Sequence, residues 1–212
     1  MRPVRIVIIA KAPIAGFAKT RLIPTLGAQR AADLARHMLR YTVANALAAK
    51  PDAVELCVTP DVADAAWPPL CLPPGIEWSA QGEGDLGLRM ARAAKRCADR
   101  NESILLIGTD CPALTVEVLR SAAAALNDHD AAMVPTFDGG YALLGLKRFD
   151  SALFSDIPWS TDQVAAMSLD RIKTLGWRVQ ALATQHDIDE PADLQWLPSS
   201  WGSWGFSETE NV

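Results

Sequence analysis

The first residues suited to chemistry are four members of one short loop, which follows the apolar stretch 4–9. Lys11, Lys19 and Arg21 bring three positive charges, and Gly16 permits a ligand to approach the backbone closely. A lysine offers a mobile point charge, whereas the planar fork of an arginine suits two phosphate oxygens at once. The loop therefore predicts a nucleotide-binding site, with a solvated basic turn as the alternative.

The motifs of several common enzyme classes are missing. The basic loop contains neither G-x-x-x-x-G-K-[ST] nor G-x-G-x-x-G, and the chain contains no G-x-S-x-G. A Walker-type NTPase, a Rossmann dehydrogenase and a serine hydrolase are therefore disfavoured.

Carboxylates follow two later apolar stretches. Asp110 comes shortly after 103–107, at a strand end where open α/β sheets hold a nucleotide-bound Mg²⁺ or Mn²⁺. The alternative for Asp110 is a local turn cap. Asp187 and Asp189 follow the stretch 177–182 and precede a predicted helix without being needed as its caps, so they are left for another role.

Two glycine clusters have open interpretations. Asp138, Gly139 and Gly140 separate two apolar stretches, so they predict a hairpin turn, a backbone surface close to a ligand, or both. The glycines at 82, 84 and 87 predict either a surface turn or an irregular entry into a helix that contributes to function.

Strand-like and helix-like stretches alternate along the chain, which predicts an α/β fold with 4–9 as a central strand of a parallel sheet. The other predicted strands are 54–58, 76–79, 103–107, 131–135 and 177–182, and the predicted helices are 28–49, 88–98, 115–126 and 162–175. Ser160 and Thr161 are interpreted as the N-cap pair of the last helix. A short helix is expected within 61–67.

Size and composition set the class of protein. The 212 residues predict a single domain over 1–197 and a tail over 198–212 that contains Trp201, Trp204 and Phe206. Half of the residues are hydrophobic, but none of the apolar stretches approaches the roughly 20 residues of a membrane span. The four cysteines have no disulfide or metal spacing, so a cytoplasmic location is expected. The net charge of −5 argues against a nucleic-acid binder.

Four segments in this order resemble a bacterial family of glycosyltransferases with the nucleotide-diphospho-sugar transferase (GT-A) fold. They are AKAPIAGFAKTRL, QGEGDLGLRM, IGTDCPALT with DGGYALLGL, and DIDEPADL. The resemblance extends to about Leu197 and implies a three-layer α/β/α sandwich with a mostly parallel sheet. More distantly, the chain is similar to 2-phospholactate guanylyltransferase and molybdenum-cofactor guanylyltransferase.

The resemblance also implies roles for individual residues. Gly16, Lys19 and Arg21 would surround the phosphates of a nucleotide, with Lys11 near the end of the strand. Asp110 and Asp189 would bind Mg²⁺ or Mn²⁺, and Asp138 would stand on the acceptor side. The D-x-D pair usual in glycosyltransferases is reduced here to Asp110 alone, because Cys111 and Pro112 follow it.

These observations predict a metal-dependent transferase that uses a nucleotide-activated donor and an unidentified small-molecule acceptor. A nucleotide sugar is the first expectation for the donor. The alternatives are a nucleotidyltransferase, which would take an NTP and release pyrophosphate, and a nucleotide-binding regulatory module with little catalytic power.

Overall fold

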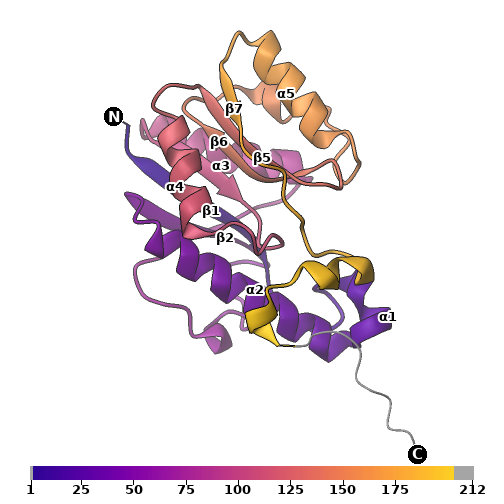
Figure 1. The fold of residues 1–212 in the computed structure, drawn as a ribbon. Coiled ribbons are helices and arrows are strands. Elements are labelled where there is room, and N and C mark those ends of the chain that lie inside the picture. Colours follow the sequence, from indigo (N-terminus) through magenta and orange to yellow (C-terminus); the bar gives the residue numbers. More distant parts are fainter. Residues whose placement is uncertain (1, 203–212) are drawn as a thin grey trace, which may run out of the picture.

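A computed structural model describes residues 2–202 of the chain and places a seven-stranded sheet at its centre (Figure 1). The strand order is β3-β2-β1-β4-β6-β5-β7. The strands are β1 (Val4–Lys11), β2 (Ala53–Thr59), β3 (Glu77–Ala80), β4 (Ser103–Ile107), β5 (Ala131–Pro135), β6 (Tyr141–Leu146) and β7 (Val179–Ala181). All neighbours pair in parallel except β6, which runs antiparallel to β4 and β5. The predicted mostly parallel sheet with a central first strand is confirmed.

Helices cover both faces of the sheet (Figure 1). The α-helices are α1 (Ile23–Leu26), α2 (Ala28–Ala48), α3 (Leu86–Asp99), α4 (Val116–Ala125) and α5 (Val164–Thr174). Side chains alternate between the faces of a strand, so Ile6 and Ile8 of β1 pack with α2 and α4, whereas Val7 packs with α3 and α5. The predicted three-layer α/β/α sandwich is therefore confirmed.

The short helix expected within 61–67 is not present. The segment forms turns, and a 3₁₀ helix follows at Pro68–Leu70. The side chains of Asp61 and Asp64 accept hydrogen bonds from the backbone two residues further on, at 3.1 and 2.9 Å. Such local bonds compete with helix formation, which explains the difference.

The prediction that Ser160 and Thr161 cap the last helix is wrong. The N-cap of α5 is Gln163, and the Thr161 hydroxyl donates instead to the carbonyl oxygen of Pro158 at 2.7 Å. Ser160 has a left-handed backbone with φ of 65°. This segment is therefore a shaped loop, and it forms part of the site described below.

The end of the described chain packs against its beginning. Two further 3₁₀ helices, Pro191–Trp196 and Ser199–Trp201, lie beside α1 and α2 (Figure 1). A hydrophobic cluster that includes Leu22, Leu34 and Ile188 joins the two regions. The expected division at residue 197 stays a prediction, and Trp204 and Phe206 of the expected tail lie outside the described residues.

Within residues 2–202, the helices are too short or too polar to cross a lipid bilayer.

Candidate functional site

The loops that carry the predicted site residues meet at one edge of the sheet. Strands β1, β4, β5 and β7 all run in the same direction, because β5 reaches β4 through the antiparallel β6. The loops after these strands therefore emerge together. They carry Lys19, Asp110, Asp138 and Asp189. The first and the last of these residues are 170 positions apart in the sequence.

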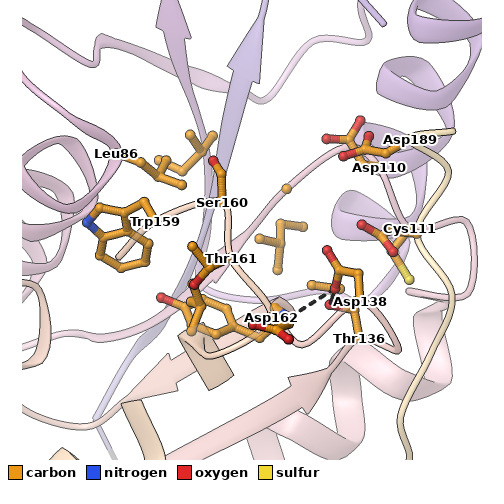
Figure 2. Close-up of a pocket in the computed structure, with 18 of the residues that line it drawn as sticks. Leu86, Asp110, Cys111, Thr136, Asp138, Trp159, Ser160, Thr161, Asp162 and Asp189 are labelled. Carbon is orange, nitrogen blue, oxygen red and sulfur yellow. Dashed lines mark hydrogen bonds between the residues drawn. The ribbon is translucent and has the colours of Figure 1, made fainter. Parts of the chain in front are cut away.

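A cleft of about 580 Å³ opens between these loops (Figure 2). Its described lining divides into two kinds of residue. The carboxylates are Asp110, Asp138, Asp162, Asp187, Asp189 and Glu190, and the largely apolar wall includes Ile9, Leu86, Met90, Tyr141, Trp159 and Val164. Figure 2 places Leu86 and Trp159 across the cleft from Asp110 and Asp189. The cleft therefore offers an acidic side and an apolar side to a ligand.

The most strongly organised part of the site is an ion-pair triad beside the cleft, made of Lys19, Asp110 and Asp189. The Lys19 Nζ lies 2.5 Å from Asp110 Oδ1 and 2.8 Å from Asp189 Oδ1, and it also donates to the carbonyl oxygen of Ile188 at 2.5 Å. The lysine side chain is only 6% exposed, whereas the two carboxylates are 47% and 41% exposed. The buried ammonium of Lys19 therefore forms ion pairs with both carboxylates from the protein side of the cleft.

Burial and charge act in opposite directions on Lys19. Burial alone would lower the pKa of its ammonium, but the facing carboxylates of Asp110 and Asp189 outweigh burial and raise the pKa overall. Lys19 is therefore a fixed positive charge in this structure, and not the mobile, solvated charge that its place in a glycine-containing loop suggested.

The backbone explains why this triad forms. The Ile188 N–H donates to the carbonyl oxygen of Asp110 at 2.8 Å, and the Ile188 side chain is fully buried in the cluster with Leu22 and Leu34. The segment that carries Asp189 is thus anchored on both sides. The capping box of Glu190 and Asp193 then starts the 3₁₀ helix that follows.

The Asp138-Gly139-Gly140 turn forms another wall of the cleft, below Asp110 in Figure 2. The Asp138 Oδ1 accepts hydrogen bonds from the Thr136 hydroxyl at 2.5 Å and from the Gly140 N–H at 2.9 Å (Figure 2). Gly139 has φ of 89°, and a Cβ atom there would lie 2.1 Å from the carbonyl oxygen of Asp162. Only a glycine lets the turn support this segment, so the turn is both a hairpin and a wall of the cleft.

A second glycine shapes the apolar side. A Cβ atom on Gly87 would lie 2.5 Å from Trp159 Nε1 and 2.5 Å from the carbonyl oxygen of Phe154. The start of α3 can therefore pack directly against Trp159, next to Leu86. Of the two interpretations of the cluster at 82, 84 and 87, this contact favours a role in shaping the site.

Asp187 is a cleft residue to which the sequence assigned no role. Burial, together with the charges of Asp138 and Asp189, raises the pKa of its carboxyl to about 6. Its position after β7 was a usable signal, because that loop ends at the same edge as the loops after β4 and β5. Trp159 and Asp162 gave no such signal, since the sequence pattern favoured a helix cap there.

The predicted site residues are only partly brought together. Arg21, Asp110, Asp138 and Asp189 line the cleft, and Lys19 contacts two of them. The Arg21 Nη1 lies 3.9 Å from Glu190 Oε1. Lys11 and Gly16 are exposed and do not line the cleft. The functional roles given to all of these residues stay predictions.

The carboxylates fit a divalent cation only as part of a shared site. Within residues 2–202, no three His, Cys, Asp or Glu side chains come together in a way that would hold a metal by themselves. Asp110 and Asp189 approach a common cation, Lys19 Nζ, with one oxygen each. Mg²⁺ is commonly bound by one or two carboxylates together with substrate phosphates and water. The donor set thus suits a cation that arrives with a nucleotide.

Comparison with solved structures supports the class of fold. A protein from Desulfovibrio desulfuricans G20, provisionally named a nucleotide-diphospho-sugar transferase, is 30% identical with a TM-score of 0.85, over 99% of this chain and 92% of that chain. The 4-diphosphocytidyl-2C-methyl-D-erythritol synthase from Anaerococcus prevotii is 12% identical with a TM-score of 0.63, over 95% of this chain and 99% of that one. The expected similarity to the nucleotide-diphospho-sugar transferase superfamily is confirmed.

Residues 42–161 match the family described as "Uncharacterized protein conserved in bacteria (DUF2064)", and the chain belongs to this family. A further structural neighbour is the manganese complex of Rv0371c from Mycobacterium tuberculosis H37Rv. It is 17% identical with a TM-score of 0.54, over 93% of this chain and 99% of that one. No curated protein shows a significant match to the chain.

Proposed function

We propose that this protein is an enzyme that transfers a group from a nucleotide-activated donor with the help of Mg²⁺ or Mn²⁺. A nucleotide sugar is the proposed donor. The observation that carries the proposal is the triad of Lys19, Asp110 and Asp189 at the strand ends, beside a cleft large enough for a nucleotide. The transferase name of the neighbour from Desulfovibrio desulfuricans G20 supports the same reaction class.

In this proposal, Asp110 and Asp189 hold the cation, which when bound neutralises the diphosphate of the donor. Lys19, whose ammonium lies beside both carboxylates, would add positive charge next to the phosphate oxygens. Arg21, which is 61% exposed at the rim of the cleft, swings onto the outer phosphate. Lys11, at the end of β1, and Gly16, earlier in the same loop, would extend the nucleotide site toward solvent. Catalysis is then mainly electrostatic.

Asp138 orients the acceptor. Its carboxylate is fixed by two hydrogen bonds to one oxygen, so its direction is set before a substrate arrives. The acceptor oxygen attacks the anomeric carbon of the donor, and the bond from that carbon to the phosphate oxygen breaks. The nucleoside diphosphate leaves with the electron pair, and the acceptor proton passes to a cleft carboxylate, for which Asp138 is proposed.

The second candidate is nucleotidyl transfer. Here the acceptor attacks the α-phosphorus of an NTP, and the bond to the bridging oxygen breaks so that pyrophosphate leaves. The observation that favours it is the lone Asp110 in the place of a D-x-D pair, together with the fold shared with the synthase from Anaerococcus prevotii. The third candidate, a nucleotide-binding module without turnover, would have the same cleft. A cytoplasmic location is proposed because the four cysteines have no disulfide spacing and are free thiols.

One assay separates these candidates. The protein is incubated with Mn²⁺ and a panel of nucleotide sugars and NTPs, and nucleoside diphosphate and pyrophosphate are measured separately. Release of the diphosphate supports glycosyl transfer, and release of pyrophosphate supports nucleotidyl transfer. Asp110→Asn should abolish either product, whereas Asp128→Asn, outside the cleft, should not. Nucleotide binding without either product would favour the module, and no binding at all would end the proposal.

A further inference from the structure

The charges around the cleft do not balance. The described lining has six carboxylates and a single cation, Arg21. Lys19 serves Asp110 and Asp189, and Arg21 lies near Glu190, so these groups belong with the donor and its metal. Three carboxylates remain, and none of them forms an ion pair with a described residue. They are Asp138, Asp162 and Asp187.

The three remaining carboxylates lie on the acceptor side. Asp138 and Asp162 come from the glycine turn and the segment it supports, and Asp187 comes from the loop after β7. Figure 2 shows Asp138 and Asp162 below Asp110 and Asp189, with Asp162 between Thr161 and Asp138. The side chain of Asp187 lines the same cleft as Asp138 and Asp162.

The same region presents an apolar and aromatic surface. Leu86 is 41% exposed at the start of α3, and Trp159 is held against that helix by the lack of a side chain on Gly87. Tyr141 and Met90 complete this wall. An aromatic ring next to unpaired carboxylates is a combination that recognises organic cations, because both the ring face and the carboxylates attract positive charge.

We propose that the acceptor is a compact molecule with an apolar body and a protonated amine, and that acceptors carrying phosphate or carboxylate groups are excluded. The inference rests on the proposed function, since it concerns the second substrate of that reaction. The amine serves binding, and a separate hydroxyl reacts. An anionic acceptor would bring like charge against Asp138, Asp162 and Asp187, which form no ion pair with a described residue.

Three matched probes test this proposal by isothermal titration calorimetry. Phenylalaninol carries an amine and a hydroxyl, 3-phenylpropan-1-ol only the hydroxyl, and 3-phenyllactate a hydroxyl and a carboxylate. Each is titrated into the protein alone and into the protein with Mn²⁺ and GDP or UDP. We expect the amine to bind about tenfold more tightly than the alcohol, and the carboxylate to bind most weakly, because one charge-assisted hydrogen bond contributes about that factor.

Variants link the preference to the cleft. Asp162→Asn should reduce the advantage of the amine over the alcohol, and Trp159→Leu should weaken all three probes. Asp170→Asn is the matched control, since this aspartate lies on α5 with a side chain that is 79% exposed and pairs with Lys173. It should change nothing.

The outcomes separate this inference from the proposed function. Equal binding of amine and alcohol, tighter binding of the carboxylate, or no binding of any probe would overturn the inference. The titrations without nucleotide measure the same order of probe affinities. A protein that binds no nucleotide but prefers the amine would therefore refute the proposed function alone. Nucleotide binding with a preference for the carboxylate would refute the acceptor inference alone.

Discussion

Replacing Lys19 by methionine should move metal affinity and nucleotide affinity in opposite directions. Methionine keeps most of the length of the side chain but removes the ammonium that lies 2.5 Å from Asp110 and 2.8 Å from Asp189. In the wild type, a free divalent cation must compete with this ammonium for both carboxylates. In Lys19→Met it does not, so the two acids are left as an unpaired, half-exposed pair that attracts a cation.

The magnitude follows from the geometry. Both carboxylate oxygens contact one atom, so they lie within about 5 Å of each other. Two like charges at that distance repel by about 3 kcal/mol at an effective dielectric constant of about 20. Because both carboxylates are nearly half exposed, solvent screening reduces this to about 1 kcal/mol. In the wild type the Lys19 ammonium offsets this repulsion, whereas in the variant nothing does, so the variant should be less stable by about 1 kcal/mol without metal.

Metal binding should relieve this repulsion. We expect the affinity of Lys19→Met for free Mn²⁺ to rise about tenfold, which corresponds to about 1.4 kcal/mol. In saturating Mn²⁺, its affinity for a nucleoside diphosphate should fall about tenfold, because one charge-assisted contact with the phosphates is lost. Mn²⁺ binding is read from the electron paramagnetic resonance signal of the free ion, and nucleotide binding by calorimetry.

The control removes an equivalent but exposed lysine. Lys95→Met breaks the ion pair with Asp99 on the surface of α3 and should leave both affinities unchanged. If Lys19→Met bound free Mn²⁺ more weakly than the wild type, the carboxylates would not be a metal site masked by Lys19. The reasoning would then be refuted.

Two further predictions concern the framework of the fold. Gly139→Ala should lower the free energy of unfolding by at least about 2 kcal/mol, because its Cβ would overlap the Asp162 backbone. Gly176→Ala has open space around it and should cost only about 1 kcal/mol for its left-handed backbone, so equal costs in urea unfolding would contradict the clash. Hydrogen bonds from Arg5 lower the pKa of Glu102 below its usual value of 4.5, so this stabilisation is complete above pH 4.5 and is lost as the pH falls below it. The stability gap between the wild type and Glu102→Gln should therefore shrink on acidification, and a gap that stayed constant between pH 7 and pH 3 would count against the prediction.

Local sequence patterns were sufficient to predict an α/β fold with a central first strand, whereas the three-layer sandwich was implied by the family resemblance. The β-branched run in 4–9 and the apolar run in 103–107 predicted buried parallel strands, because both faces of such strands are covered. Asp110 was found for a related reason, since residues that follow parallel strands are gathered at one edge by the topology alone. Asp138 was found as part of a D-G-G turn between two apolar stretches.

The side-chain geometry of the site could not be predicted in this way. The contact of Lys19 with Asp189 depends on the burial of Ile188 among residues from the other end of the chain, which is a long-range packing event. Trp159 joins the cleft only because a distant glycine, Gly87, lets α3 approach it. Ser160 and Thr161 follow a cap-like pattern, but the support of Gly139 under the next residue favours a loop over an earlier start of α5.

A crystal structure of the protein with Mn²⁺ and a nucleoside diphosphate tests the central claim most directly. We predict an anomalous Mn²⁺ peak bound by Asp110, Asp189 and the phosphates, with the Lys19 ammonium turned toward a phosphate oxygen. A Mn²⁺ ion bound away from these carboxylates, or a nucleotide bound outside the cleft, would contradict the account.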